Sequence, residues 1–439
     1  MSTVPGDIDT DRQPPLSIPL RHFVVALGFL LSGAALGLAD ALDAAPGLAR
    51  AAHLHLLFVG FVCLTIAGAM TQFVPVWSGT ALHSRRLARA QLWLVAVGLV
   101  GLVVGFLGGR VTLLAPAGAL VLTGFWTLAY NVGRTLATAR PLDVTERHFA
   151  VALAFFVALT PLGLLLAASF VVPLFATLPV TRGGVVAAHA TLAVFGAVLT
   201  TVFGALYQLV PMFGQTELRG VDHALQRVET VAYPAGVVAL SAGRLVTSLP
   251  LARLGAALLL AGVLAFLVVL GRLLADARAE GTPMLIRYAC LAPAALAWAV
   301  LAAPAWLRDP LADAARFGAP GTGHLLALVL LFVLVGTLYH VVPFLVWVHR
   351  YSDRLGFEDV PMIDDLYDAR LARADLLLVA GGGALLLAGD LTAGRSPVVA
   401  GGAALAVGLA AVAANLLLVL RRHAPASLRG GADGDATGD

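Results

Sequence analysis

Apolar residues come in long runs that are separated by short polar segments rich in Arg, Asp, Gly and Pro. Each run is close to the roughly 20 residues that an α-helix needs to cross a hydrocarbon layer of about 30 Å. The pattern therefore predicts an all-α, polytopic membrane protein with about twelve transmembrane helices. The predicted spans are residues 22–40, 52–77, 91–109, 111–133, 149–173, 183–213, 229–248, 252–271, 288–306, 322–348, 375–390 and 396–420.

The composition agrees with lipid as the main solvent. Hydrophobic residues make up 60% of the chain, charged residues 12%, and the mean hydropathy is +0.92. These values exclude a water-soluble globular protein. The net charge of +3 is explained by arginines in loops, so it gives no reason to expect a nucleic-acid partner. Cys63 and Cys290 fall inside spans, and without a C-x-x-C-H motif the sequence predicts neither a disulfide framework nor covalent c-type haem.

The topology follows from the position of the arginines. The segment before the first span contains Asp7, Asp9 and Asp11 and lacks a basic leader, so we expect that the first span is no cleaved signal peptide. Cationic loops are retained in the cytoplasm. One of the two orientations leaves only eight arginines outside, namely Arg50, Arg110, Arg182, Arg244, Arg253, Arg308, Arg316 and Arg395. Both termini are therefore predicted to be cytoplasmic, in a plasma-membrane protein surrounded by lipid, with residues 1–16 and 424–439 as disordered tails.

An internal repeat relates the second and sixth spans. A-H-L-H-L-L-F-V-G-F-V-C-L-T-I-A-G-A-M-T-Q-F-V-P-V-W aligns without a gap with A-H-A-T-L-A-V-F-G-A-V-L-T-T-V-F-G-A-L-Y-Q-L-V-P-M-F, at a constant separation of 136 positions. The matched pairs are His53 and His189, Gly60 and Gly196, Gly68 and Gly204, Gln72 and Gln208, and Pro75 and Pro211.

The tenth span continues the series. Gly336, His340 and Pro343 lie 132 positions after their counterparts in the sixth span, and His324 is shifted by three positions from the histidine register. Related second, sixth and tenth spans predict three pseudo-symmetric groups of four helices. The approximate repeats are residues 20–147, 148–287 and 288–423, within a single domain over residues 17–423.

The repeat predicts one layer of histidines near the outer surface. At about 100° and 1.5 Å per residue, His53 shares a helix face with Gly60, as His189 does with Gly196. His324 lies about 60° around its helix from this position, and His55 about 200° from His53. His340 lies about 24 Å from His324 along the same helix, so these two cannot share a metal.

A b-type haem in a bilayer needs two neutral imidazoles, an apolar slot and cations near its propionates. The candidate ligands are His53, His55, His189 and His324, with Gly60 and Gly196 leaving room for the macrocycle. Arg50 is a candidate propionate partner, as are Arg182, Arg308 and Arg316. The alternative is that these histidines only pack at helix ends. A solvated role at the lipid head groups is expected for His22, His83, His148, His223, His349 and His423.

The strings H-L-H-L-L-F-V-G-F with A-G-A-M-T-Q-F-V-P, and A-H-A-T-L-A-V-F-G-A with F-G-A-L-Y-Q-L-V-P, resemble helices of the haem-copper oxidase superfamily. The similarity is to cbb-type subunit I and its shorter NnrS-like relatives. It implies a low-spin haem b held by His324 and by His53 or His55, with His189 as a copper ligand. It also implies an electron-donor protein or additional subunits as partners.

Two departures from that family put catalysis in doubt. The seventh span reads V-A-Y-P-A-G-V-V-A-L-S-A-G without the adjacent histidine pair of the copper site, and Leu326 stands where a second tenth-span histidine is expected. Carboxylates are expected only in loops and at span ends, as with Asp40, Asp375 and Asp390, which leaves no proton route. The favoured hypothesis is a haem protein for electron transfer or for nitric oxide or metal handling. The alternatives are an oxidoreductase, as a terminal oxidase or nitric oxide reductase subunit with copper, and a 12-span transporter.

Overall fold

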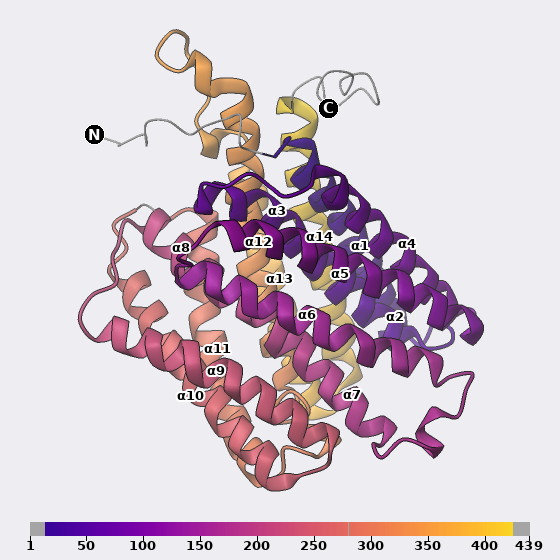
Figure 1. Cartoon of the computed structure of the whole chain (residues 1–439). Helices are drawn as coiled ribbons and strands as arrows, with labels where there is room; N and C mark the ends of the chain where they lie inside the picture. Colours follow the sequence, from indigo (N-terminus) through magenta and orange to yellow (C-terminus); the bar gives the residue numbers. More distant parts are fainter. Residues whose placement is uncertain (1–13, 280, 425–439) are drawn as a thin grey trace. The chain divides into compact units, whose positions relative to one another are not determined.

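The computed structural model describes residues 14–279 and 281–424, and it shows only helices and connecting turns, with no β-strand in these residues (Figure 1). This confirms the all-α prediction. The predicted disordered tails lie almost wholly outside the described residues. Nine of the predicted spans correspond to the helices α1 (Ser17–Ala41), α4 (Arg85–Leu107), α5 (Leu114–Thr138), α6 (Val144–Ala168), α9 (Val221–Leu245), α10 (Leu249–Ala275), α11 (Pro283–Arg308), α13 (Ala369–Thr392) and α14 (Arg395–His423).

The three repeat-bearing spans are longer. The second consists of α2 (Ala49–His55), the π-helical segment η2 (Leu56–Cys63) and α3 (Leu64–Ser78). The sixth consists of α7 (Arg182–Thr191), the π-helical segment η5 (Leu192–Leu199) and α8 (Thr200–Gly214). The tenth is the single helix α12 (Thr322–Tyr351).

Eleven of the helical segments are long and apolar enough to cross a membrane, so the chain is a multi-pass membrane protein. The twelfth segment is α9, which contains Asp222, Arg227, Glu229 and Arg244 and does not reach the same hydropathy. The prediction of about twelve long helices is thus confirmed. Of these, α9 is more polar than the other eleven.

Polar caps explain why two helices begin before the apolar runs. Asp143 accepts a hydrogen bond from the Glu146 N–H while the Glu146 carboxylate accepts one from the Asp143 N–H, so α6 begins at Val144. The Thr282 hydroxyl likewise caps α11. The second and third groups of helices therefore begin four and five residues before the expected starts at 148 and 288.

The chain divides into two units, each of which we describe by itself. The first unit comprises residues 14–26, 54–208 and 230–259, and the second comprises residues 27–53, 209–229, 260–279 and 281–424. In the first unit α3 packs on α4 and α5, α5 packs on α6, and α6 packs on α7 and η5. In the second unit α12 packs on α11, α13 and α14, and α13 packs on α14.

The repeat extends to the backbone. The segments η2 and η5 are both eight residues long and lie 136 positions apart, the same displacement as in the sequence repeat. A π-helical turn holds one more residue than an α-helical turn and is frequent at functional sites. The tenth span has no such segment, because α12 is a continuous α-helix of 30 residues.

His22 and His148 occupy matched positions against the repeat helices. The Cβ of each lies against a glycine of the following span, Gly68 or Gly204, where an added methyl group would clash. Each imidazole Nδ1 donates to the carbonyl oxygen four residues earlier, at 2.8 Å for His22 and 2.7 Å for His148. Both side chains are buried, with 1% and 4% of their surface exposed, so the expectation of a solvated role is wrong for these two histidines. The glycines explain the burial, because they let the first helix of a repeat approach the second closely.

A matched clamp fixes the third and fourth helices of the first and third repeats. The Asn131 side chain accepts from the Ser84 N–H at 2.9 Å and donates to the Ser84 carbonyl at 3.0 Å. Asn415 makes the same two bonds, both at 2.9 Å, with Asp368. The separation is 47 residues in both clamps. The Leu371 and Arg370 N–H groups hold the pKa of Asp368 below its ordinary value, so this cap is charged at neutral pH.

Asn131→Ala is expected to lower the free energy of unfolding by about 1–3 kcal/mol, because the half-buried Ser84 backbone N–H and carbonyl groups both lose their partner. Unfolding in mixed detergent micelles measures the change. Thr123→Ala on the same helix is the matched control, since the Thr123 hydroxyl bonds only to its own helix, at Ala119. Equal stability of the two variants would contradict the clamp.

Candidate functional site

The second-span histidine His53 sits in a socket on α1 within the second unit. Its Nδ1 lies 2.7 Å from the carbonyl oxygen of Gly33. A Cβ on Gly37 would lie only 2.6 Å from the same Nδ1, so only glycine admits the ring. Because a carbonyl oxygen only accepts hydrogen bonds, the imidazole carries its proton on Nδ1 and keeps a lone pair on Nε2.

The sixth-span histidine His189 sits in an equivalent socket on α6 within the first unit. Its Nδ1 lies 3.1 Å from the carbonyl oxygen of Leu159, and a Cβ on Gly163 would lie 2.9 Å from its Cε1. Leu159 and Gly163 each lie 126 positions after Gly33 and Gly37. His53 and His189 are therefore held by the same arrangement of a carbonyl oxygen and a glycine, which we call the histidine socket. In both sockets the nitrogen left for a ligand is Nε2.

His55 and His189 are the two candidate ligands that belong to the first unit. His55 ends α2 and lies within electrostatic range of His189. Its ring contacts Phe106 at 5.4 Å between ring centroids, with the planes inclined by 48°. This pair supplies two imidazoles from two different spans, which is the donor set that a six-coordinate haem iron uses.

His324 is held differently. Its Nε2 lies 2.8 Å from Oδ2 of Asp390 on α13, and the two side chains are 31% and 45% exposed. A carboxylate on one imidazole nitrogen is a common second-shell arrangement of metal-ligating histidines, and it leaves Nδ1 for the metal. His324 therefore has Nδ1 free for a metal, whereas His53 and His189 have Nε2.

The third repeat has no histidine socket. His148 packs on Gly204 as Arg287 packs on Gly336, so His148 and Arg287 occupy matched positions. Counted from these two residues, Ala302 on α11 occupies the position that Gly163 has on α6. Gly318, with φ +118°, packs on Ala302, where a Cβ would lie 2.7 Å from the alanine methyl group. The loop before α12 thus fills the space that an imidazole occupies in the other repeats.

The remaining predicted residues are placed as follows. Arg50 is exposed in the first turn of α2 and lies within electrostatic range of His53. Gly60 is buried in η2. Gly196 faces the Phe155 ring, because a Cβ there would lie 2.9 Å from Phe155 Cγ. A macrocycle beside Gly196 would require that ring to move.

Helix α9 supports the span that carries His189, through two residues that the sequence pattern did not indicate as part of the site. The Tyr233 hydroxyl donates to the Phe195 carbonyl in η5 at 2.6 Å. Arg244 Nη1 donates to the Thr191 hydroxyl at 2.7 Å. Arg244 is buried near the carboxyl end of α9. The sequence signal for the role of Arg244 was its position in the otherwise apolar carboxyl-terminal part of α9.

A second polar cluster lies in the second unit, and we call it the Arg287–Asp375 cluster. Arg287 forms an ion pair with Asp375 and donates to the Ala372 carbonyl at 2.8 Å. Tyr339 donates to Asp375 at 2.5 Å, and Asn415 donates to the Tyr339 hydroxyl at 3.1 Å. Asp375 is fully buried in the second turn of α13, which begins at Ala369, before the apolar run.

The donor chemistry limits which groups the chain fits. Within residues 14–279 and 281–424, no three His, Cys, Asp or Glu side chains are close enough together to hold a metal ion. A pair of imidazoles fits the two axial positions of haem iron. It does not by itself supply the three ligands of a copper or zinc site.

No protein-family model matches the chain, and no curated protein is significantly similar to it. The structure shows an integral, multi-pass membrane protein.

Proposed function

We propose that the chain is a haem-binding membrane protein of the kind the haem-copper oxidase resemblance implies, with His55 and His189 as axial ligands of one haem b. The histidine socket carries the proposal. It fixes the tautomer and orientation of His189 through a backbone carbonyl, which raises the basicity of Nε2. The nearby His55 supplies the second imidazole.

Other residues of the first unit suit the remaining needs of a haem. Arg182 begins α7, on the helix of His189, and its guanidinium lies 5.0 Å from the Phe170 ring centroid, at the exposed end where propionates would lie. Phe106 and Phe155 line the helices with apolar surface that excludes water. A bound haem supplies one-electron chemistry and, when a ligand leaves, a site for a diatomic gas.

The proposed role is electron transfer or the handling of nitric oxide. Copper-dependent oxygen reduction is disfavoured, since the only histidine of α9 is His223 at the cytoplasmic end of the predicted topology. His53 and His324 belong to the second unit and are the proposed ligands of a second haem or metal. The socket of His53 and the Asp390 partner of His324 support this assignment.

The full-length protein, purified from haem-sufficient cells, is expected to show a Soret band and reduced α and β bands of a low-spin haem b. His189→Ala and His55→Ala are each expected to lower haem content about tenfold or more, because an axial ligand is lost. His223→Ala is the matched control, since this histidine is exposed on α9. Added imidazole is expected to restore the spectrum of His189→Gly.

Protein without a Soret band, before and after titration with haemin, would contradict the proposal. If His223→Ala loses as much haem as His189→Ala, the lower haem content results from impaired folding and not from the loss of a ligand. If His53→Ala and His324→Ala lower a second spectral component together, the second unit binds its own group. If they change no spectral component, it does not.

A further inference from the structure

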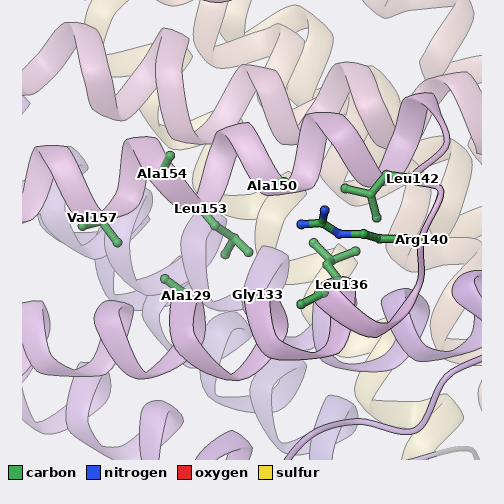
Figure 2. A pocket seen from close by; sticks show the side chains of 10 residues that line it. Ala129, Gly133, Leu136, Arg140, Leu142, Ala150, Leu153, Ala154 and Val157 are labelled. Atoms are coloured by element: carbon green, nitrogen blue, oxygen red, sulfur yellow. The ribbon is translucent and has the colours of Figure 1, made fainter.

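An open-sided groove runs between α5 and α6 of the first unit and has a volume of about 300 Å³. Its lining combines small residues with larger apolar ones from both helices (Figure 2). The lining residues are Ala129, Gly133, Leu136, Ala137, Arg140, Leu142, Ala150, Leu153, Ala154 and Val157. Arg140 is the only charged one. Figure 2 shows its guanidinium lying between the two helices at the loop end of the groove.

The groove is about as long as the hydrocarbon part of one lipid leaflet is thick. Arg140 lies in the connection between α5, which ends at Thr138, and α6, which begins at Val144, so it sits at the membrane surface. The groove extends along α5 to Ala129 and along α6 to Val157. These lengths correspond to about 14 Å and 20 Å of helix, close to half of a hydrocarbon layer of about 30 Å.

The charges at the loop end favour an anion. Arg140 is exposed, and no ion pair of its side chain occurs among the described residues. Arg134 and Arg147 are its basic neighbours in the chain, while Asp143 and Glu146 are the acidic ones. Both carboxylates accept backbone N–H bonds in the cap of α6. A phosphate matches the planar guanidinium, which donates two parallel hydrogen bonds.

We propose that this groove binds one anionic glycerophospholipid, with an acyl chain along α5 and α6 and the phosphate on Arg140. A transmembrane helix of a second copy would be the other occupant of a surface lined with small residues. The exposed Arg140 at the end of the groove favours the lipid, because a guanidinium pairs with a phosphate and has no counterpart on an apolar helix face. The predicted topology places Arg140 on the cytoplasmic side, where anionic lipids are enriched.

The test measures lipid retained by the full-length protein after exchange into detergent, with phosphatidylglycerol or phosphatidylcholine added back and native mass spectrometry as the readout. We expect one retained phosphatidylglycerol and weaker retention of phosphatidylcholine. Arg140→Gln is expected to weaken phosphatidylglycerol binding about tenfold, to the level of phosphatidylcholine. Arg86→Gln is the matched control, an exposed arginine at the start of α4 that does not line the groove, and should bind as the unchanged protein does.

Ala154→Leu fills the groove and is expected to weaken binding of both lipids. Equal phosphatidylglycerol retention by Arg140→Gln and the unchanged protein would overturn the proposal. A dimer that Ala154→Leu dissociates, with no lipid retained by either protein, would assign the groove to a second copy and also overturn it. If Ala154→Leu fails to fold, Arg140→Gln alone decides, because an exposed loop residue is not needed for packing.

Discussion

Asp375→Ala is expected to lower the free energy of unfolding by about 3–5 kcal/mol. The loss leaves the Arg287 guanidinium buried without its counter-charge. It also removes the acceptor of the Tyr339 hydroxyl. Breaking a buried ion pair on one side is strongly destabilising, because the remaining charge has neither water nor a partner.

The measurement is unfolding of the full-length protein in mixed micelles, followed by helical circular dichroism. Arg287→Met should be destabilising by a similar amount, whereas the double variant Arg287→Met, Asp375→Leu is expected to recover most of the loss, since it buries no charge. Asp353→Ala is the control, on an exposed carboxylate after α12. Additive losses in the double variant would mean that the two side chains do not stabilise the fold as a pair.

Gly255→Val is expected to lower the free energy of unfolding by about 3 kcal/mol, at the upper end of what overpacking costs. A Cβ on Gly255 of α10 would lie 2.6 Å from the Leu240 Cα of α9. A Cβ on Gly243 of α9 would lie similarly close to the Ala252 Cα of α10, at 2.7 Å. The neighbouring atoms are backbone atoms, so no side-chain rotation makes room, and the two helices must move apart.

Gly271→Ala on the same helix is the matched control, because nothing lies within 4 Å of its Cβ position. It should leave stability unchanged or raise it by about 0.5–1 kcal/mol, as expected for glycine to alanine in a helix interior. Thermal unfolding of both variants measures the difference. If Gly255→Val and Gly271→Ala unfold at the same temperature, close backbone contact between α9 and α10 is not needed for stability.

Hydropathy was enough to predict the helices and their approximate limits, because each apolar run has the length that a bilayer requires. The polar first turns were missed, since Asp143 and Glu146 form a cap whose residues are themselves hydrophilic. The π-helical segments were also missed. The sequence of η2 contains only apolar residues and one glycine, so it has no periodicity from which an extra residue per turn could be detected.

The candidate site was predicted only in part. The register of His53 and His189 came from the repeat, but the sockets depend on contact with Gly37 and Gly163, which a helix-by-helix alignment of the second and sixth spans does not include. Extending the alignment to the preceding spans would have paired these glycines at 126 positions. Asp390 beside His324 could not be foreseen, because α12 and α13 meet through a long connection.

The two π-helical segments also record the history of the chain. A π-helical turn holds one residue more than an α-helical turn, so each segment amounts to an inserted residue at one place in the helix. The insertion stands at the same register in η2 and η5. A matched inserted residue is what a duplication of one ancestral group of helices would leave in η2 and η5, and α12 lacks it.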